Sequence, residues 1–205
     1  MSDFDRVLAR YEERAAREER RMATMSFEEL AGSVDQFLLG VGPVVGSFLA
    51  DLARGLGARR ILELGTSHGY STLWLARAAK DCGARVVSVD VAAAKQAYAA
   101  EQLRDAGLDD VVELRTSDAI EVIAGLDGVF DLVLLDIWKD LYIACFDAAR
   151  AKMAPGGILV ADNMLEPAAH RETAQRYRDH IRALPGIQSV LLPLGQGLEV
   201  TRFGA

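Results

Sequence analysis

From Arg60 onward, the sequence alternates short apolar runs with longer amphipathic segments. The runs are too short for a stable helix and rich in valine, isoleucine and leucine, whereas the segments between them have apolar residues at helical spacing. This alternation is typical of a parallel β-sheet whose strands are connected by crossover helices. The predicted strands span residues 61–64, 86–89, 111–114, 132–135 and 158–161, and the predicted helices span residues 71–80, 92–106, 119–124, 142–152 and 168–184.

The end of the chain predicts a different kind of strand pairing. Two further apolar runs, residues 188–192 and 198–203, flank the turn sequence Pro-Leu-Gly-Gln-Gly, which is typical of an antiparallel hairpin. Antiparallel strands often extend one edge of an otherwise parallel sheet. We therefore predict an α/β fold with a doubly wound, mostly parallel seven-stranded sheet and an antiparallel C-terminal hairpin. Because no repeat or linker interrupts the pattern, we expect residues 1–205 to form a single domain.

The N-terminal segment differs from the rest of the chain in its density of charge. Residues 1–21 are crowded with arginine and glutamate at helical spacing, and Phe4, Val7 and Leu8 add a narrow apolar stripe. We expect a charged helix here, either an arm used in dimerisation or a solvated, frayed terminus. A capping box from Ser26 to Glu29 predicts a short second helix, and Pro43 is suited to start a helix over residues 44–56, within a core of residues 40–205.

Composition limits the classes of partner. The chain has 205 residues, of which 51% are hydrophobic, and its 23 basic and 30 acidic residues give a formal net charge of −7. That charge offers no electrostatic reason to expect a nucleic acid or an anionic membrane as a partner, so small molecules are expected instead. The N-terminus lacks the pattern of a secretion signal and no apolar run approaches a membrane span, which predicts a cytoplasmic protein. Cys82 and Cys145 are the two cysteines, and their isolation gives no support for a disulfide framework.

Oxygen-bearing side chains follow two of the predicted strands directly. Asp136 comes after one apolar run, and Asp162 and Asn163 come after the next. The carboxyl ends of parallel strands share one edge of the sheet, where ligands bind, so these side chains can converge on one hard cation. We expect Mg²⁺, with Ca²⁺ or Mn²⁺ as substitutes. The alternative is that these carboxylates only cap helices or orient loops.

A glycine turn follows the first predicted strand. Residues 65–71, Gly-Thr-Ser-His-Gly-Tyr-Ser, connect this strand to a helix and allow a ligand to approach the backbone closely. The turn lacks the full glycine pattern of a dinucleotide site, although a tight turn with a purely structural role would look similar. Asp90 ends the second strand, where a carboxylate can accept hydrogen bonds from both ribose hydroxyls. Together these features indicate a nucleoside ligand without a pyrophosphate.

The combined motifs resemble a known enzyme family. The motifs are Ile-Leu-Glu63-Leu-Gly65 with Gly69-Tyr70-Ser71, then Val-Asp90, Leu-Asp136-Ile-Trp138-Lys139-Asp-Leu-Tyr142, and finally Ala-Asp162-Asn163. In this order they are similar to the class I, metal-dependent O-methyltransferases that use S-adenosylmethionine, which have a Rossmann-like fold and include the catechol and caffeoyl-CoA O-methyltransferases. The resemblance begins at about Gly40 and extends to the final hairpin. It implies a homodimer that methylates a hydroxyl of a small aromatic acceptor, with adjacent hydroxyls expected on that acceptor.

The resemblance also implies a role for individual residues. Glu63, Gly65 and Ser71 would hold the methionine part of the cofactor, and Asp90 would bind its ribose. The remaining cofactor contacts are expected from Val41, Ser117, Asp118, Ala119, Asp136 and Trp138, and the metal ligands from Asp136, Asp162 and Asn163. For Ser117 and Asp118, a simple helix N-cap is the competing explanation.

Lys139 matches the catalytic lysine of that family and would accept the proton of the acceptor hydroxyl. The competing explanation is a surface ion pair with Asp140 or Asp136. His68, within the glycine turn, is expected to be a polar loop residue, and the alternative is that it faces the substrate or the sulfur of the cofactor. Two rival functions also stay open: a noncatalytic S-adenosylmethionine-binding module and a nicotinamide-dependent oxidoreductase.

Two departures from the catechol enzyme concern the acceptor. Ile137 stands where that enzyme has histidine, and residues 187–194 contain no acid, although that enzyme uses a carboxylate from the corresponding region. The sequence therefore leaves the acceptor open among catechols, phenolic acids, flavonoids and other secondary metabolites.

Overall fold

The computed structural model describes residues 1–33 and 36–204 of the chain. A seven-stranded sheet with the order β3-β2-β1-β4-β5-β7-β6 runs through its centre. The first five strands in the sequence are parallel, and β7 joins the edge of β5 in the antiparallel direction before pairing with β6. The predicted fold is confirmed. The strands are β1 (Arg60–Leu64), β2 (Arg85–Asp90), β3 (Val112–Thr116), β4 (Phe130–Leu135), β5 (Met153–Ala161), β6 (Ile187–Leu192) and β7 (Leu198–Phe203).

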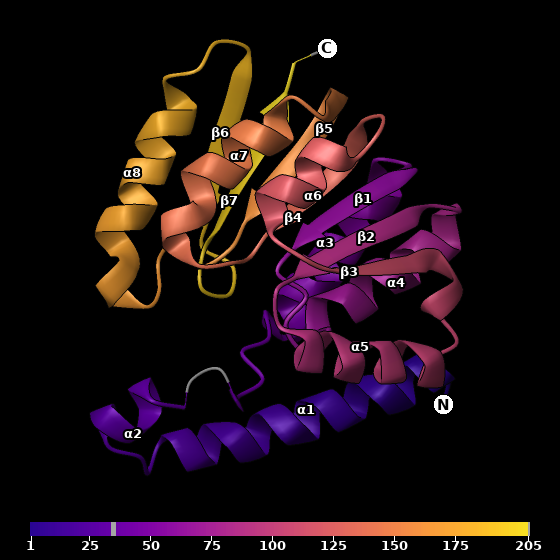
Figure 1. The fold of residues 1–205 in the computed structure, drawn as a ribbon, viewed down its shortest axis with the longest axis vertical. Helices are drawn as coiled ribbons and strands as arrows, with labels where there is room; N and C mark the ends of the chain where they lie inside the picture. Colours follow the sequence, from indigo (N-terminus) through magenta and orange to yellow (C-terminus); the bar gives the residue numbers. More distant parts are fainter. Residues whose placement is uncertain (34–35, 205) are drawn as a thin grey trace.

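Helices cover both faces of this sheet, as Figure 1 shows. One apolar core lies between the sheet and the helices α1, α3, α4 and α5, and a second lies between the sheet and α6, α7 and α8. Strands such as β4 bury side chains on both faces, which explains their continuous apolar runs. The helices are α1 (Asp3–Met22), α2 (Phe27–Ala31), α3 (Gly42–Gly55), α4 (Tyr70–Cys82), α5 (Ala93–Asp105), α6 (Ala119–Gly125), α7 (Tyr142–Arg150) and α8 (Arg171–Arg182).

Two strand boundaries differ from the sequence prediction. The strand predicted to begin at Val111 begins one residue later, because Asp109–Val111 forms a 3₁₀ turn. The strand β5 begins at Met153 rather than at Ile158, and this early part contains Pro155 and Gly156. Its pairing with β4 shifts register between Phe130 and Leu132, so the added residues form an irregular extension of the ladder.

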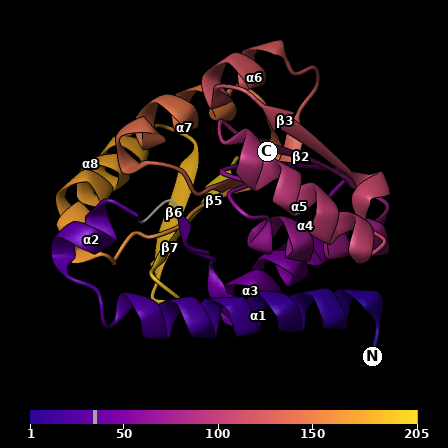
Figure 2. The same cartoon turned by 60° about the horizontal axis from the view of Figure 1, so that its bottom comes forward.

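The N-terminal helix α1 packs against the body of the protein. A capping box between Ser2 and Asp5 starts the helix, and Phe4, Val7 and Tyr11 are buried. Its neighbours are α4 and α5, and Figure 2 shows it passing along the side of the fold that carries α3. The alternative of a solvated, frayed terminus is therefore wrong. The capping box at Ser26 and the helix start near Pro43 are both confirmed.

Two further observations concern the chain as a whole. Cys82 ends α4 and Cys145 is buried in α7, and both are free thiols. Among the described residues, no helix combines the length and apolar character needed to cross a lipid bilayer.

The glycine turn (residues 65–71) begins with an unusually close backbone contact. Gly65 has a φ of 106°, and a Cβ at this position would overlap with the carbonyl oxygen of Asp136. The amide of Asp136 in turn donates to the carbonyl of Leu64 over 2.9 Å. The end of β1 can approach the end of β4 this closely only because residue 65 lacks a side chain.

Substitution of Gly65 by alanine tests this constraint. We expect Gly65→Ala to lower the free energy of unfolding by roughly 3 kcal/mol or more, from backbone strain and overpacking together. Gly107→Ala is the matched control, because Gly107 has a φ of 66° and no described atom lies within 4 Å of the point that a Cβ would occupy. It should cost only about 1 to 2 kcal/mol. Equal losses for both variants in urea unfolding would contradict the proposed steric constraint.

Candidate active site

The carboxyl ends of the parallel strands bring most of the predicted site residues to one edge of the sheet. The glycine turn follows β1, Asp90 ends β2, and Ser117 follows β3. Asp136 follows β4, and Asp162 follows β5. Because neighbouring strands are about 4.8 Å apart, the edge from β3 to β5 spans roughly 19 Å, enough for an extended nucleoside ligand and a second small molecule.

The predicted metal ligands lie at the ends of the adjacent strands β4 and β5. The amide of Asp162 donates to the carbonyl of Leu135 over 3.1 Å, which joins the two strand ends. The Asp162 carboxylate accepts a hydrogen bond of 2.7 Å from the backbone amide of Asn163. Asn163 has a left-handed φ of 56°, a conformation that asparagine tolerates better than most residues. Asp162 is buried, whereas Asp136 and Asn163 are half-buried.

Lys139 joins this group as a buried cation. Its side chain is only 8% exposed, and its Nζ lies 3.1 Å from the carbonyl oxygen of Asp162 and 3.2 Å from Oδ1 of Asn163. The same Nζ donates to the hydroxyl of Tyr142. The surface ion pair considered from the sequence is therefore not what the structure shows.

The electrostatics of the group reflect this burial. Burial raises the pKa of Asp136 to about 6 against the opposing effect of Lys139. Burial and the nearby Asp136 raise the pKa of Asp162 to about 7, and burial lowers the pKa of Lys139 to about 8. Two carboxylates that are hard to ionise together are a suitable environment for a bound cation, which favours their charged form.

The donor set fits a divalent cation with oxygen ligands. Two aspartates and an asparagine offer carboxylate and amide oxygens, the ligand type that Mg²⁺ prefers while keeping open positions. Within residues 1–33 and 36–204, no group of three or more His, Cys, Asp or Glu side chains is arranged to hold a metal. Asp136, Asp162 and Asn163 do not meet that criterion, because Asn163 is an amide rather than a His, Cys, Asp or Glu. Metal binding by these residues stays a prediction.

Glu63 lies fully buried beneath the glycine turn. Its carboxylate accepts hydrogen bonds from the hydroxyls of Ser71, Thr72 and Ser88, over 2.6 Å in the case of Ser71. Burial raises the pKa of Glu63 to about 7, although the three hydroxyls oppose the shift. Glu63 thus holds the first turn of α4 in place, and one oxygen has only Ser71 as a hydrogen-bond partner among the described residues.

Asp90 has the geometry that a ribose-binding carboxylate needs. One oxygen accepts from the amide of Ser67 over 2.7 Å, and the other accepts from the amide of Ala92 over 2.8 Å. A carboxylate has about four acceptor sites, so each oxygen can accept one further hydrogen bond from a diol. The hydrogen-bonding capacity of Asp90 and Glu63 and the open backbone of the glycine turn therefore fit the predicted cofactor.

The other predicted cofactor residues differ in burial and in local role. Asp118 caps α6 by accepting from the amides of Ile120 and Glu121, so the N-cap explanation holds for this residue, whatever contact it also makes to a ligand. Ser117 and Ala119 flank it and are half-buried. Trp138 is 57% exposed, and Val41 is the half-buried residue that precedes α3.

Three residues near the site make contacts that the sequence did not predict. Tyr142 is fully buried, and its hydroxyl donates to the carbonyl of Asp162 over 3.2 Å. Its position three residues after Lys139 was the available signal. Gln196, between two glycines of the final hairpin loop, accepts from the amide nitrogen of Asn163 over 2.7 Å, and nothing local predicts that long-range contact.

His68 is the third of these residues; it lies in the loop, as expected, but its side chain is only 8% exposed. Burial and the charge of Arg14 lower the pKa of His68 to about 4, so its ring is neutral at neutral pH. Its Nε2 lies 3.2 Å from a guanidinium nitrogen of Arg14 and acts as the acceptor, because arginine can only donate. Nδ1 then carries the hydrogen, and it is buried without a hydrogen-bond partner among the described residues.

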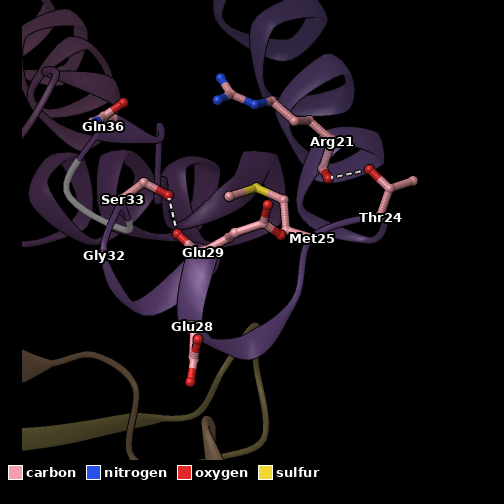
Figure 3. Close-up of a pocket in the computed structure, with 8 residues that line it drawn as sticks. All are labelled: Arg21, Thr24, Met25, Glu28, Glu29, Gly32, Ser33 and Gln36. Atoms are coloured by element: carbon pink, nitrogen blue, oxygen red, sulfur yellow. Dashed lines mark hydrogen bonds between the residues drawn. The ribbon is translucent and has the colours of Figure 1, made fainter.

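A separate hollow lies between the end of α1 and α2 (Figure 3). Eight residues line it: Arg21, Thr24, Met25, Glu28, Glu29, Gly32, Ser33 and Gln36. Two of its polar groups already have partners within the chain, because Thr24 donates to the Arg21 carbonyl and Ser33 donates to the Glu29 carbonyl. None of the predicted site residues lines it. The hollow is therefore not the place where the strand-end residues meet.

Comparison with known proteins identifies the family. The sequence matches the family described as a methyltransferase domain over residues 62–164, just over half of the chain. It is 33% identical over 171 residues to catechol O-methyltransferase from Niastella koreensis, covering 76% of each chain. It is 27% identical over 177 residues to caffeoyl-CoA O-methyltransferase 1 from Eucalyptus globulus, covering 77% of this chain and 72% of the relative.

A solved structure shows the same relationship. The O-methyltransferase TomG from Streptomyces achromogenes, crystallised in complex with SAM, superposes with a TM-score of 0.75 at 28% identity and 82% coverage of both chains. These similarities favour methyl transfer over the nicotinamide-dependent alternative. The chain belongs to the class I S-adenosylmethionine-dependent O-methyltransferases of the catechol and caffeoyl-CoA O-methyltransferase type.

Proposed function

We propose that this enzyme methylates one hydroxyl of a small aromatic acceptor that carries two adjacent hydroxyls. In this proposal, Asp136, Asp162 and Asn163 hold a divalent cation, Mg²⁺ by preference and Ca²⁺ or Mn²⁺ as substitutes, and Lys139 is the general base. The observation that carries the proposal is the convergence at the ends of β4 and β5, where Nζ of Lys139 lies 3.2 Å from Oδ1 of Asn163. Base and proposed ligands thus occupy one small, largely buried volume.

In this proposal, each group of residues along the sheet edge binds a different part of S-adenosylmethionine. Asp90 would accept from the ribose hydroxyls, while Glu63 and Ser71 would hold the methionine end at the glycine turn. Ser117, Asp118 and Ala119 would bound the adenine side, and Val41 and Trp138 would add apolar walls. Asp136 would lie nearest the methyl group, which supports transfer beside Lys139, because transfer requires donor and acceptor to be close.

Transfer itself is a displacement at carbon. The acceptor oxygen forms a bond to the methyl carbon as the carbon–sulfur bond breaks. The electron pair of the carbon–sulfur bond stays with sulfur. The hydroxyl proton would pass to the neutral amine of Lys139, which burial makes accessible by lowering the pKa of Lys139 to about 8. The Tyr142 hydroxyl and the Asp162 carbonyl hold Nζ in position. When bound, the cation supplies charge stabilisation for the negative charge that develops on the acceptor.

The surface next to the proposed base supports an aromatic acceptor. Trp138 is 57% exposed and Leu141 is 37% exposed, and both lie in the segment that carries Lys139. An aromatic ring can pack against such side chains while its hydroxyls face the oxygen ligands. The names of the relatives above agree with a catechol or caffeoyl-type acceptor. Ile137 and the absence of an acid in residues 187–194 leave phenolic acids and flavonoids within the class.

Homodimer formation and a cytoplasmic location stay predictions. The apolar stripe of α1 is buried within its own chain, so a dimer arm would have to use the charged, exposed face of that helix.

The reaction is tested by transfer of labelled methyl from S-adenosylmethionine to a panel of catechols, phenolic acids and flavonoids. We expect labelling of at least one acceptor with Mg²⁺ and loss of that labelling in chelator, restored by added Mg²⁺. Labelling that persists unchanged in chelator would refute the metal proposal. Binding of S-adenosylhomocysteine by calorimetry without labelling of any acceptor would favour the noncatalytic module.

Asp136→Asn separates the proposed metal site from the cofactor site. The variant should lose methyl transfer and bind Mn²⁺ at least tenfold more weakly, because one carboxylate charge is removed, while binding of S-adenosylhomocysteine stays within about threefold. Asp140→Asn, an exposed neighbour in the same segment, is the control. If Mn²⁺ titration by electron paramagnetic resonance gives the same affinity for Asp136→Asn and wild type, Asp136 is not a ligand.

Lys139→Met and Lys139→Arg together test the general base. Methionine removes both charge and proton acceptor, whereas arginine keeps the charge but does not lose its proton. Both should lower kcat by about 10²- to 10⁴-fold with little change in cofactor affinity. Lys80→Met, at an exposed lysine, should leave kcat unchanged. Recovery of most activity in Lys139→Arg would show that the lysine contributes only its charge.

Gln196 tests the orientation of Asn163. Its side-chain oxygen accepts from Nδ2 of Asn163, which turns Oδ1 toward Lys139 and the proposed metal position. Gln196→Leu should weaken Mn²⁺ binding by about tenfold, the low end for residues that orient a metal ligand, since Gln196 is exposed. Gln196→Glu keeps the acceptor oxygen and should retain the affinity. A normal Mn²⁺ affinity in Gln196→Leu would rule this role out.

A further inference from the structure

Three side chains of α1 lie on one face of the helix and contact two separate loops near the proposed cofactor site. Tyr11, Arg14 and Glu18 occupy positions i, i+3 and i+7, which share one side of an α-helix. The segment lies outside the family motifs, and the proposed mechanism gives it no role. Its contacts connect parts of the chain that are far apart in sequence.

The first contact holds the glycine turn. The hydroxyl of Tyr11 donates to the carbonyl oxygen of His68 over 2.5 Å, and Tyr11 is only 1% exposed. Its ring packs edge-on against Tyr70, with 5.6 Å between ring centroids. The fit is tight, because a Cβ at Gly69 would lie 3.1 Å from the Tyr11 hydroxyl. A carbonyl of the turn is therefore fixed by a residue more than fifty positions earlier in the chain.

The second contact links the turn to α5. The guanidinium of Arg14 lies over the ring of Tyr98 at 4.9 Å from its centroid and reaches Nε2 of His68 at 3.2 Å. His68 and Tyr98 also pack edge-on at 5.7 Å. His68 is therefore held twice by α1: Arg14 contacts its side chain, and Tyr11 binds its carbonyl oxygen.

The third contact reaches the segment at residues 36–41. One carboxylate oxygen of Glu18 pairs with Arg14 over 2.7 Å, and the other accepts from the amide of Leu38 over 2.5 Å. The side chains of Arg14 and Glu18 are 17% and 16% exposed, so this ion pair is much better shielded than a typical surface pair. Arg14 also donates to the carbonyl of Gln36 over 3.3 Å. The segment continues to Val41, the proposed apolar wall of the cofactor site.

We infer that α1 is a positioning element of the cofactor site, in which Tyr11, Arg14 and Glu18 hold the glycine turn and residues 36–41 at the separation that receives S-adenosylmethionine. The inference rests on the proposed cofactor site. These three are positioning residues, because their contacts are to the loops that border the ligand. When one of these contacts is removed, the two loops sample other conformations. The apparent Kd for the cofactor then rises in inverse proportion to the fraction of molecules that can still bind it.

Two single substitutions test the inference on the full chain. Tyr11→Phe keeps the buried ring and removes the hydroxyl, and Glu18→Ala releases Leu38 while preserving helix propensity. We expect each to weaken binding of S-adenosylhomocysteine by about five- to tenfold in calorimetry, with a less favourable binding entropy. Hydrogen exchange of the glycine turn should be faster than in wild type before the ligand is added and should return to the wild-type rate after it.

Two matched controls separate positioning from general loss of stability. Tyr177→Phe removes another buried tyrosine hydroxyl, one without a hydrogen-bond partner among the described residues, and Glu13→Ala removes a glutamate from the exposed face of α1. Both should bind the ligand as wild type does. Unchanged affinity and unchanged exchange of the turn in Tyr11→Phe and Glu18→Ala would overturn the inference while leaving the proposed function intact. If wild type itself fails to bind S-adenosylhomocysteine, the proposed cofactor site is wrong, and the inference fails with it.

Discussion

The close approach of the ends of β1 and β4 is the constraint on which the site depends. Asp136 donates its amide to Leu64, and Gly65 leaves room for the Asp136 carbonyl. The glycine turn and the segment that carries Lys139 are therefore fixed to each other by backbone contacts. Small displacements between reacting groups can cost orders of magnitude in rate, so this backbone contact would help to keep the two halves of the proposed site in register.

The fold and the strand-end residues could be predicted because their signals are local. A short apolar run that ends in an acid or a glycine contains both the strand and the position of its last side chain, and parallel pairing then brings these positions together. Asp90, Asp136 and Asp162 accordingly lie where the sequence placed them. The family resemblance assigned a role to each of these residues. Residue type alone left some roles open between ligand binding and helix capping, as Asp118 illustrates.

The features that could not be predicted depend on contacts distant in sequence. The extension of β5 across Pro155 and Gly156 follows from its pairing with Phe130, against local residue preference. Burial of His68 depends on α1, whose arginine-rich sequence looks solvated until Tyr11 and Arg14 are seen to pack against the glycine turn. Arg14 takes part in a buried contact because its partners come from other elements of the fold. The spacing of residues within α1 does not reveal those partners.

The charges of the site are consistent with the proposed chemistry. Ionised Asp136 and Asp162 with a protonated Lys139 sum to −1 in a largely buried volume, and uncompensated buried charge is costly. A divalent cation with a neutral lysine brings the sum to zero. In the proposed reaction, transfer of a proton from the acceptor hydroxyl to Lys139 would separate charge without changing the total. Methyl transfer from the positive sulfonium to the negative oxygen would then remove both charges, and partial exclusion of water would strengthen the attraction between them.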